Sequence, residues 1–322
     1  QSAGRSAGSP TGPTGCEMNQ VVEGLAPQRV EAVRRPRLDW PLRRVIGAAM
    51  VASLVLLALL GNLVIPGDPL EQHLYRALQG ADAVGVSDAG EVITSAPLGY
   101  DHLGRSLYHR LVAALGLSLS IAAGAVILAA FSGISLGLLA AGRGGWAERL
   151  LSLVADSLLA LPGLLLVLMV SVILPSTPLA LWLGLSLVLW VEFFRLARAT
   201  GRSVLASPGV EASRLLGFGA WYRFRHHLWP EMAPVMMTAM AFGMANALMA
   251  IAALGFVHVG IPEPTPELGT MMVELLPYWR EAPFALLTPV LVTFLLLLGL
   301  LLMSGSKART STAADTLEGA RP

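Results

Sequence analysis

The segment Gly133-Ile-Ser-Leu-Gly137 matches the G-x-S-x-G pattern in which many hydrolases present a nucleophilic serine. That chemistry needs a sharp turn between a strand and a helix, with histidine and acidic partners for the serine. Here the pattern lies within residues 111–142, a stretch that contains no charged residue. Small residues four positions apart in an apolar helix are typical of a helix-packing face. We therefore expect a packing contact here and assign no catalytic residue to the chain.

A second pattern of possible chemistry is a ladder of methionines, Met232, Met236, Met240 and Met244, at every fourth position. This spacing places them on one face of a helix. They could be soft packing between helices, an adaptable lining for varied solutes, or soft-metal ligands. We note Met236, Met240 and Met244 as a possible lining of a translocation pathway, and we assign no metal.

The composition identifies the environment in which these residues must work. Of 322 residues, 55% are hydrophobic and only 13% are charged, and mean hydropathy is +0.66. Soluble domains carry about 25% charged residues. Such a chain needs the lipid bilayer as its solvent. Its net charge of +1 gives no reason to expect nucleic acid as a partner, and a single cysteine, Cys16, excludes an internal disulfide.

The hydropathy pattern predicts an all-α polytopic protein with six transmembrane helices, since a span needs roughly 20 apolar residues. The expected spans are residues 45–65, a helix within 111–142, 150–174, 179–195, 232–257 and 282–304. Pro175 and Pro178 mark a turn between the third and fourth spans. Asp156 is the one acid within the third span, and we expect it to be a helix-end residue rather than a functional one.

The distribution of Lys and Arg predicts the orientation. With the N-terminus in the cytoplasm, the outside segments hold only four of the 22 basic residues. The expected segments are a partly disordered cytoplasmic tail at 1–44, the first span at 45–65, an extracytoplasmic segment at 66–110, a membrane core at 111–304 with a cytoplasmic loop at about 196–231, and a cytoplasmic tail at 305–322. The chain is therefore expected to span a membrane several times, in contact with lipid, with both termini in the cytoplasm.

The long cytoplasmic loop is the most informative segment. Residues 210–216 read as a short helix, and Gly217 suits a left-handed stop just after it. A second helix is expected from about Ala220, giving way near Pro230. The loop is thus predicted to be a helix–glycine–helix element that could dock into a cleft on a soluble partner.

The spacing within this loop resembles the EAA loop of bacterial ABC importer permeases. Glu211-Ala212 is followed by Gly217, His227 and Pro230 at the spacing of that motif. In particular the chain resembles the C-type subunits of dipeptide, oligopeptide, nickel and opine–metal importers. Further matches follow in order along residues 40–300: Leu98-Gly-Tyr-Asp101-His-Leu-Gly104-Arg105, Gly144-Gly145-Trp146, Asp156 with Leu161-Pro162, Trp190 with Arg195 and Arg198, and Pro264-Thr-Pro266-Glu-Leu-Gly269.

The resemblance implies the type I ABC importer permease fold, a place in a bacterial inner membrane and a transport role without enzymatic activity. It implies a heterodimer with a second permease, two ABC ATPase subunits and an extracytoplasmic solute-binding protein. ATP and Mg would be held by the ATPases, because this chain has no P-loop and is expected to bind no cofactor. Glu211, Ala212, Gly217, His227 and Pro230 would belong to the loop that couples to the ATPases.

The resemblance also implies an extracytoplasmic motif made by Asp101, His102, Gly104 and Arg105. The chain departs from the family pattern at Ser213, where a second alanine is usual, and at Ser106, where Asp is usual. These departures bear on the cargo rather than on the fold. Peptides are the expected cargo, with nickel or a metal–opine chelate as the alternative.

Two other functions would need different sequence features. An intramembrane hydrolase would need a serine–histidine or metal constellation within the spans. An ion-coupled secondary transporter would need paired acids or broken helices in an inverted repeat. Asp156 is isolated and no repeat is visible, so the ATP-driven importer is the preferred function.

Overall fold

The computed structural model describes residues 42–81, 85–86, 92–93, 97–174, 178–257, 259–262 and 264–304. The predictions for most of the first tail and for the tail at 305–322 concern residues outside these ranges. The elements below all belong to one compact unit, which begins at Leu42.

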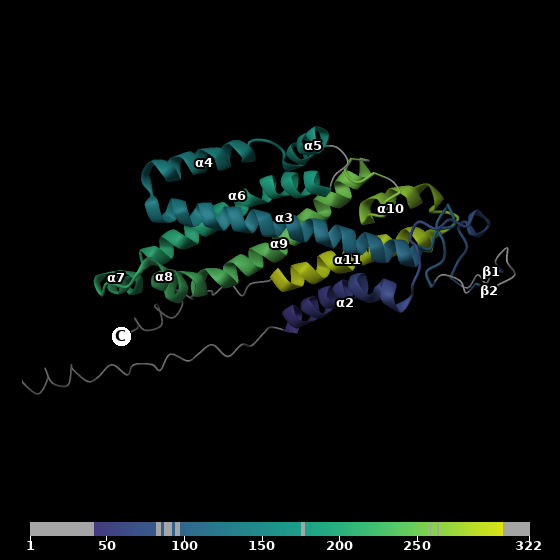
Figure 1. The fold of residues 1–322 in the computed structure, drawn as a ribbon, viewed down its shortest axis with the longest axis horizontal. Helices are drawn as coiled ribbons and strands as arrows, with labels where there is room; N and C mark the ends of the chain where they lie inside the picture. Colours follow the sequence, from purple (N-terminus) through teal and green to yellow (C-terminus); the bar gives the residue numbers. More distant parts are fainter. Residues whose placement is uncertain are drawn as a thin grey trace, which may run out of the picture. The chain divides into compact units, whose positions relative to one another are not determined.

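Helices make up nearly all of the described structure (Figure 1). They are α2 (Leu42–Val64), α3 (Leu107–Arg143), α4 (Gly145–Leu159), α5 (Gly163–Ile173), α6 (Pro178–Leu205), α7 (Pro208–Leu215), α8 (Ala220–Arg223), α9 (Trp229–Phe256), α10 (Leu268–Leu275) and α11 (Pro283–Ser304). Short 3₁₀ turns lie at Leu74–Arg76 and Leu276–Tyr278. The β-structure of the described part consists of two antiparallel strands of two residues each, β1 (Gly85–Val86) and β2 (Val92–Ile93), and an isolated bridge between Tyr100 and Ser106. The all-α fold class is confirmed.

Within the described ranges, five helices are long and apolar enough to cross a membrane: α2, α3, α6, the continuous helix Ala220–Phe256, and α11. They correspond to five of the six predicted spans. Helix α3 begins at Leu107, four residues before the expected start, so the end of the predicted extracytoplasmic segment is already helical. With 37 residues, α3 is about 55 Å long, well beyond the apolar thickness of a bilayer.

The predicted third span, residues 150–174, is not one straight helix. It is the pair α4 and α5, bent by 90° at the break between Leu159 and Gly163. Pro162 causes the break, because its ring blocks the helical hydrogen bond and restricts the residue before it. The pair is either a broken span or a re-entrant segment, so the described residues hold five candidate spans, and a sixth only if the bent pair crosses the membrane.

Helices α3 and α6 pack closely, and the segment Gly133–Gly137 lies at their contact. An added Cβ on Gly133 would lie 2.6 Å from the carbonyl oxygen of Trp190, and one on Gly137 would lie 2.7 Å from that of Phe194. The two glycines therefore let the helix backbones approach, as the small-residue spacing predicted.

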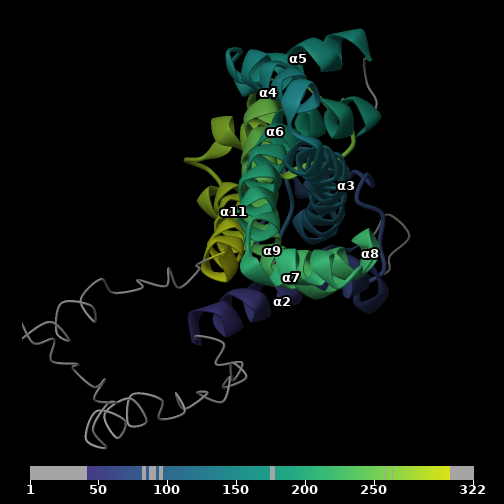
Figure 2. The ribbon, with the colours of Figure 1, turned by 90° about the vertical axis from the view of Figure 1, so that its left-hand side faces the viewer.

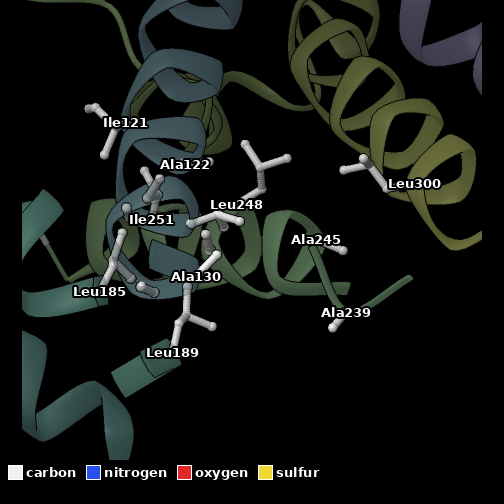
Figure 3. Close-up of a cluster of buried hydrophobic side chains, with 14 of the residues drawn as sticks. Ile121, Ala122, Ala130, Leu185, Leu189, Ala239, Ala245, Leu248, Ile251 and Leu300 are labelled. Atoms are coloured by element: carbon white, nitrogen blue, oxygen red, sulfur yellow. The ribbon is translucent and has the colours of Figure 1, made fainter. Parts of the chain in front are cut away.

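A core of small and branched apolar side chains joins these helices (Figure 3). Ile121 and Ala122 come from α3, Leu185 from α6, and Leu248 and Ile251 from α9. Several core positions of α3 and α9 are alanine, which keeps the side chains between the helices short. The view in Figure 2 faces the end of this unit at which α7 and α8 lie.

The α3–α6 contact generates a stability prediction. Gly133→Ala should lower the thermal midpoint of the purified subunit in detergent, because the new methyl group meets backbone; overpacking of this kind costs about 1–3 kcal/mol. Gly142→Ala is the matched control in the same helix, where an added Cβ meets nothing within 4 Å and alanine gains about 1 kcal/mol of helix propensity. Equal midpoints for the two variants would contradict a tight contact at Gly133.

Candidate functional site

A helix–glycine–helix element spans residues 208–228 and is called the elbow here. Its first limb, α7, starts with Pro208 directly after Ser207. The limb ends at Gly217, which has a φ of +80°. The amides of Gly217 and Phe218 donate to the carbonyl oxygens of Arg214 and Ser213, each at 3.1 Å. These two bonds form a Schellman stop, which requires a left-handed residue and favours glycine, as predicted.

The second limb of the elbow continues directly into α9. Between α8 and α9, residues Phe224–Leu228 form a π-helical turn in which the Trp229 amide donates to the carbonyl of Phe224. The expectation that the helix gives way near Pro230 is therefore wrong. The wider turn accommodates Pro230, which cannot donate to the helix and would otherwise crowd the preceding turn.

A side-chain hydrogen bond ties the two limbs together. The Ser213 hydroxyl donates to the Gly209 carbonyl at 2.9 Å, and it lies 2.8 Å from Nε2 of His227. Since the hydroxyl has one proton, Nε2 of His227 must donate to Ser213. The serine that departs from the family pattern thus supplies a partner for a motif histidine across the elbow.

The outer surface of the elbow is apolar and aromatic. Leu215, Leu216 and Trp221 are 84%, 75% and 73% exposed. Tyr222 stacks between Phe218 and His226, with ring centroids 4.3 and 4.2 Å apart. A contiguous exposed apolar surface of this kind indicates a place where another protein docks.

The predicted coupling residues gather on or beside this surface. Glu211 and Ala212 are exposed on α7, whereas His227 is half-buried between the limbs and Pro230 is exposed at the start of α9. Glu211 lines a cleft of about 620 Å³ between α7, α8 and the ends of α3 and α6. The elbow therefore combines a hydrogen-bonded frame, an apolar tip and an acid, Glu211, that lies beside a cleft and makes no ion pair with another described residue.

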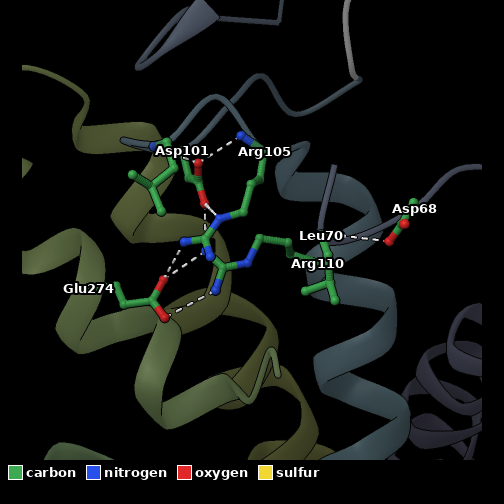
Figure 4. A network of polar contacts seen from close by, with 7 residues as sticks. Asp68, Leu70, Asp101, Arg105, Arg110 and Glu274 are labelled. Atoms are coloured by element: carbon green, nitrogen blue, oxygen red, sulfur yellow. Dashed lines mark hydrogen bonds and ion pairs between the residues drawn. The ribbon is translucent and has the colours of Figure 1, made fainter. Parts of the chain in front are cut away.

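The predicted extracytoplasmic motif forms a second polar site, called the Arg105 cluster, made of Asp101, Arg105, Arg110 and Glu274 (Figure 4). Nε of Arg105 lies 2.6 Å from Asp101, and its Nη2 lies 2.9 Å from Glu274. Arg110 reaches the same two carboxylates at 2.5 and 2.7 Å. Arg110 lies in the first turn of α3 and Glu274 is on α10, so the cluster fastens both helices to the motif.

Local backbone geometry explains the motif residues. The Asp101 carboxylate accepts the amides of Leu103 and Arg105 at 2.9 and 2.8 Å. Gly104 has a φ of +70°, and an added Cβ would lie on the His73 carbonyl. His102 stacks on Tyr278. Although burial opposes ionisation, the Arg105 amide and the charges of Arg105 and Arg110 hold the pKa of Asp101 below its usual range.

Sequence reasoning grouped Asp101, His102, Gly104 and Arg105, but it missed Arg110 and Glu274 as their partners. Glu274 is separated from Arg105 by 169 residues, and no short motif links them. The ligand atoms of Asp101, His102 and Glu274 lie within 4.8 Å of one another. Both carboxylates already bind two guanidinium groups, whose charge would repel a cation, so the geometry is that of a structural ion-pair cluster.

The methionine ladder lies mainly within the helix bundle. Met232 and Met236 are buried, while Met240 and Met244 are partly buried and pack against the same core. This position agrees with packing between helices. The assignment of Met236, Met240 and Met244 to a pathway lining stays a prediction.

The Arg105 cluster predicts a strong effect at Glu274. Glu274→Gln should destabilise the subunit by about 3–5 kcal/mol, because it leaves two buried arginines short of a counter-charge. Glu281→Gln is the matched control, since Glu281 is exposed and has no ion pair among the described residues. The check is the thermal midpoint in detergent. A midpoint unchanged from that of the control would show that the cluster contributes little.

Comparison with known proteins identifies the family. The model of the binding-protein-dependent transport system inner membrane component matches residues 133–307, more than half of the chain. The dipeptide transport system permease protein DppC of Alkalihalophilus pseudofirmus is 30% identical over 257 residues, which cover 79% of this chain and 80% of that protein.

Two other relatives agree. The di/tripeptide transport system permease protein DppC of Pseudomonas aeruginosa is 33% identical over 80% of this chain and 83% of its own length. The glutathione transport system permease protein GsiD of Pectobacterium atrosepticum is 30% identical over 62% of this chain and 67% of its own. The apolar helices, the motifs and these matches together show that the chain belongs to the ABC importer permeases of the peptide family, as an integral inner-membrane subunit that is not itself an enzyme.

Proposed function

We propose that this chain forms half of the translocation pathway for a peptide-like solute that an extracytoplasmic binding protein delivers. A second permease would form the other half, and two ABC ATPase subunits, which hold ATP and Mg, would drive the cycle. The peptide-like cargo is supported by the relatives, which are named as dipeptide, di/tripeptide and glutathione permeases. The elbow is the observation that carries the proposal.

The elbow suits transmission of force between an ATPase and the spans. Its apolar tip at Leu215, Leu216 and Trp221 offers surface for burial against a soluble partner. The α7 limb follows α6 after only Ala206 and Ser207, and the second limb continues into α9 as one helix, Ala220–Phe256. A displacement of the tip would therefore move two membrane-spanning helices together.

The proposed orientation places the elbow in the cytoplasm and the Arg105 cluster outside. In the sequence, all but four of the 22 Lys and Arg residues fall in the segments predicted to be cytoplasmic, in agreement with the positive-inside rule. Arg198 and Arg202 near the end of α6 pair with Glu148 at the start of α4, which supports a charged membrane boundary there. The termini would then both lie in the cytoplasm.

Uptake by reconstituted vesicles tests the proposal. Vesicles that contain this subunit with its second permease and ATPases should take up the dipeptide alanyl-alanine when loaded binding protein and ATP are supplied. Omission of the ATPases should abolish uptake. Uptake by this chain without any nucleotide-binding partner would contradict the proposal.

The same assay tests the elbow. Gly217→Val should abolish coupled uptake, because a β-branched residue does not tolerate a φ of +80° and the Schellman stop would be lost. Gly219→Val is the matched control, since Gly219 has a φ of −65° and an added Cβ at either glycine meets nothing within 4 Å. Both variants should insert and assemble. Full uptake by Gly217→Val would show that the elbow's geometry is not needed.

A further inference from the structure

A large pocket lies between α5, α6 and α9, with Leu159 at the end of α4 on its rim. Its volume is about 760 Å³, which is within the range of small-molecule sites. Most of its wall is aliphatic, with Val167 from α5, Leu185 and Leu189 from α6, and Ala250 from α9. Three lining residues are polar: Glu192 and Arg195 on α6, and Asn246 on α9.

The two charged residues lie toward the cytoplasmic end of the expected membrane-spanning part of α6. A helix that enters the bilayer at Pro178 has about 21 Å of its length before Glu192 and about 26 Å before Arg195, at 1.5 Å per residue. Both values are below the roughly 30 Å thickness of the hydrocarbon core. Glu192 would then lie about 9 Å inside the core, where a carboxylate favours a bundle interior or a water-filled cavity over lipid, whereas Arg195, about 4 Å from the edge, can also reach the interface.

The three polar residues of the pocket have no polar partner among the described residues. Glu192, Arg195 and Asn246 are exposed, and within the described residues they make no hydrogen bond or ion pair. The neighbouring arginines differ: Nη1 of Arg198 lies 2.6 Å from the Ser152 hydroxyl, and Nη1 of Arg202 lies 2.8 Å from Glu148. Arg195 points to the pocket instead of to α4, and its charge is available to a ligand.

Glu192 and Arg195 together fit a ligand that carries a positive and a negative group a short distance apart. Glu192 and Arg195 are three positions apart, so their side chains leave the same face of α6 a few ångströms from each other. A carboxylate binds an ammonium group, and a guanidinium binds a carboxylate, often with two hydrogen bonds. Asn246 on the facing helix can both donate to and accept from a peptide group, and the aliphatic wall suits varied side chains.

We propose that this pocket is a solute subsite within the permease, which binds a short zwitterionic peptide during its passage. Glu192 binds the peptide's ammonium group, Arg195 binds its carboxylate, and Asn246 orients the peptide bond between them. The inference rests on the proposed importer function and adds the site and its ligand chemistry. With this subsite, the membrane subunit would select peptides whose amino and carboxyl termini are both free, in addition to any selection by the binding protein.

Transport by charge-removal variants tests the subsite. Glu192→Gln and Arg195→Gln should each lower uptake of alanyl-alanine at least about tenfold at low peptide concentration, the loss expected for a hydrogen bond to a charged group. ATPase activity stimulated by the loaded binding protein should stay within about twofold of wild type, because neither residue lies on the elbow. Glu281→Gln should leave both activities unchanged.

The outcomes are distinct. Unchanged uptake in both Glu192→Gln and Arg195→Gln would overturn the subsite. If the complexes purified with these variants lacked the second permease, the two charges would be contacts between the permeases, and this result would also overturn the subsite. Failure of wild-type vesicles to import alanyl-alanine with ATP would instead refute the importer proposal itself.

Cysteine labelling tests whether the pocket holds water in the assembled complex. In a Cys16→Ser background, Val188→Cys, which lines the pocket about 15 Å along α6 from Pro178, should react with a charged, membrane-impermeant thiol reagent added to vesicles whose two faces are both accessible. Phe294→Cys on α11, where Phe294 is 57% exposed on an apolar helix, should resist the reagent. Equal resistance at both positions would show that lipid or protein fills the pocket, and it would overturn the subsite.

Discussion

The unbroken helix from Ala220 to Phe256 is the constraint on which the rest of the structure depends. An exposed surface element can move a transmembrane span only if nothing between them bends. The π-helical turn at Phe224–Leu228 keeps the helix continuous past Pro230, although proline normally ends or kinks a helix. The hydrogen bond between Ser213 and His227 then fixes the first limb of the elbow to this helix. The elbow is therefore a rigid extension of the membrane helices rather than a loose loop.

The positions of the charged residues follow from the apolar surroundings of the membrane helices. At one end, two arginines and two carboxylates are buried together in the Arg105 cluster, where each charge has a partner. At the other end, Glu148 pairs with two arginines of α6. Glu192 and Arg195 are different, because they face a pocket and remain unpaired within the described residues. In an apolar medium, paired charges hold a structure together, whereas unpaired ones are expected at a functional site.

Much of this fold could be predicted from the sequence because bilayer helices have a strong signal. Five spans, the short helix before Gly217 and the packing role of Gly133 all follow from local apolar length, one glycine conformation and a four-residue spacing. The 90° bend at Pro162 was missed, since its flanks are as apolar as a continuous span. The continuation past Pro230 was also missed, because hydropathy and proline rules do not reveal a π-turn.

The sites could be predicted only where their residues are close in sequence. Asp101 and Arg105 form one short motif, but their partner Glu274 is brought to them by α10, which no local pattern indicates. Glu192 lies three residues before the end of the span predicted at 179–195, where a charged residue is ordinary. The structure extends α6 to Leu205 and places Glu192 on a pocket with Asn246 of a distant helix, which periodicity alone does not reveal.

The central claim is that the elbow is the contact between this subunit and an ATPase. The most direct measurement is cross-linking of the assembled importer through a single cysteine at Leu216, which is 75% exposed at the elbow's tip, in a Cys16→Ser background. The account predicts that Leu216→Cys forms a cross-link to the ATPase subunit, from the cytoplasmic side only. A cross-link to the extracytoplasmic binding protein, or labelling of this cysteine from outside intact cells, would contradict it.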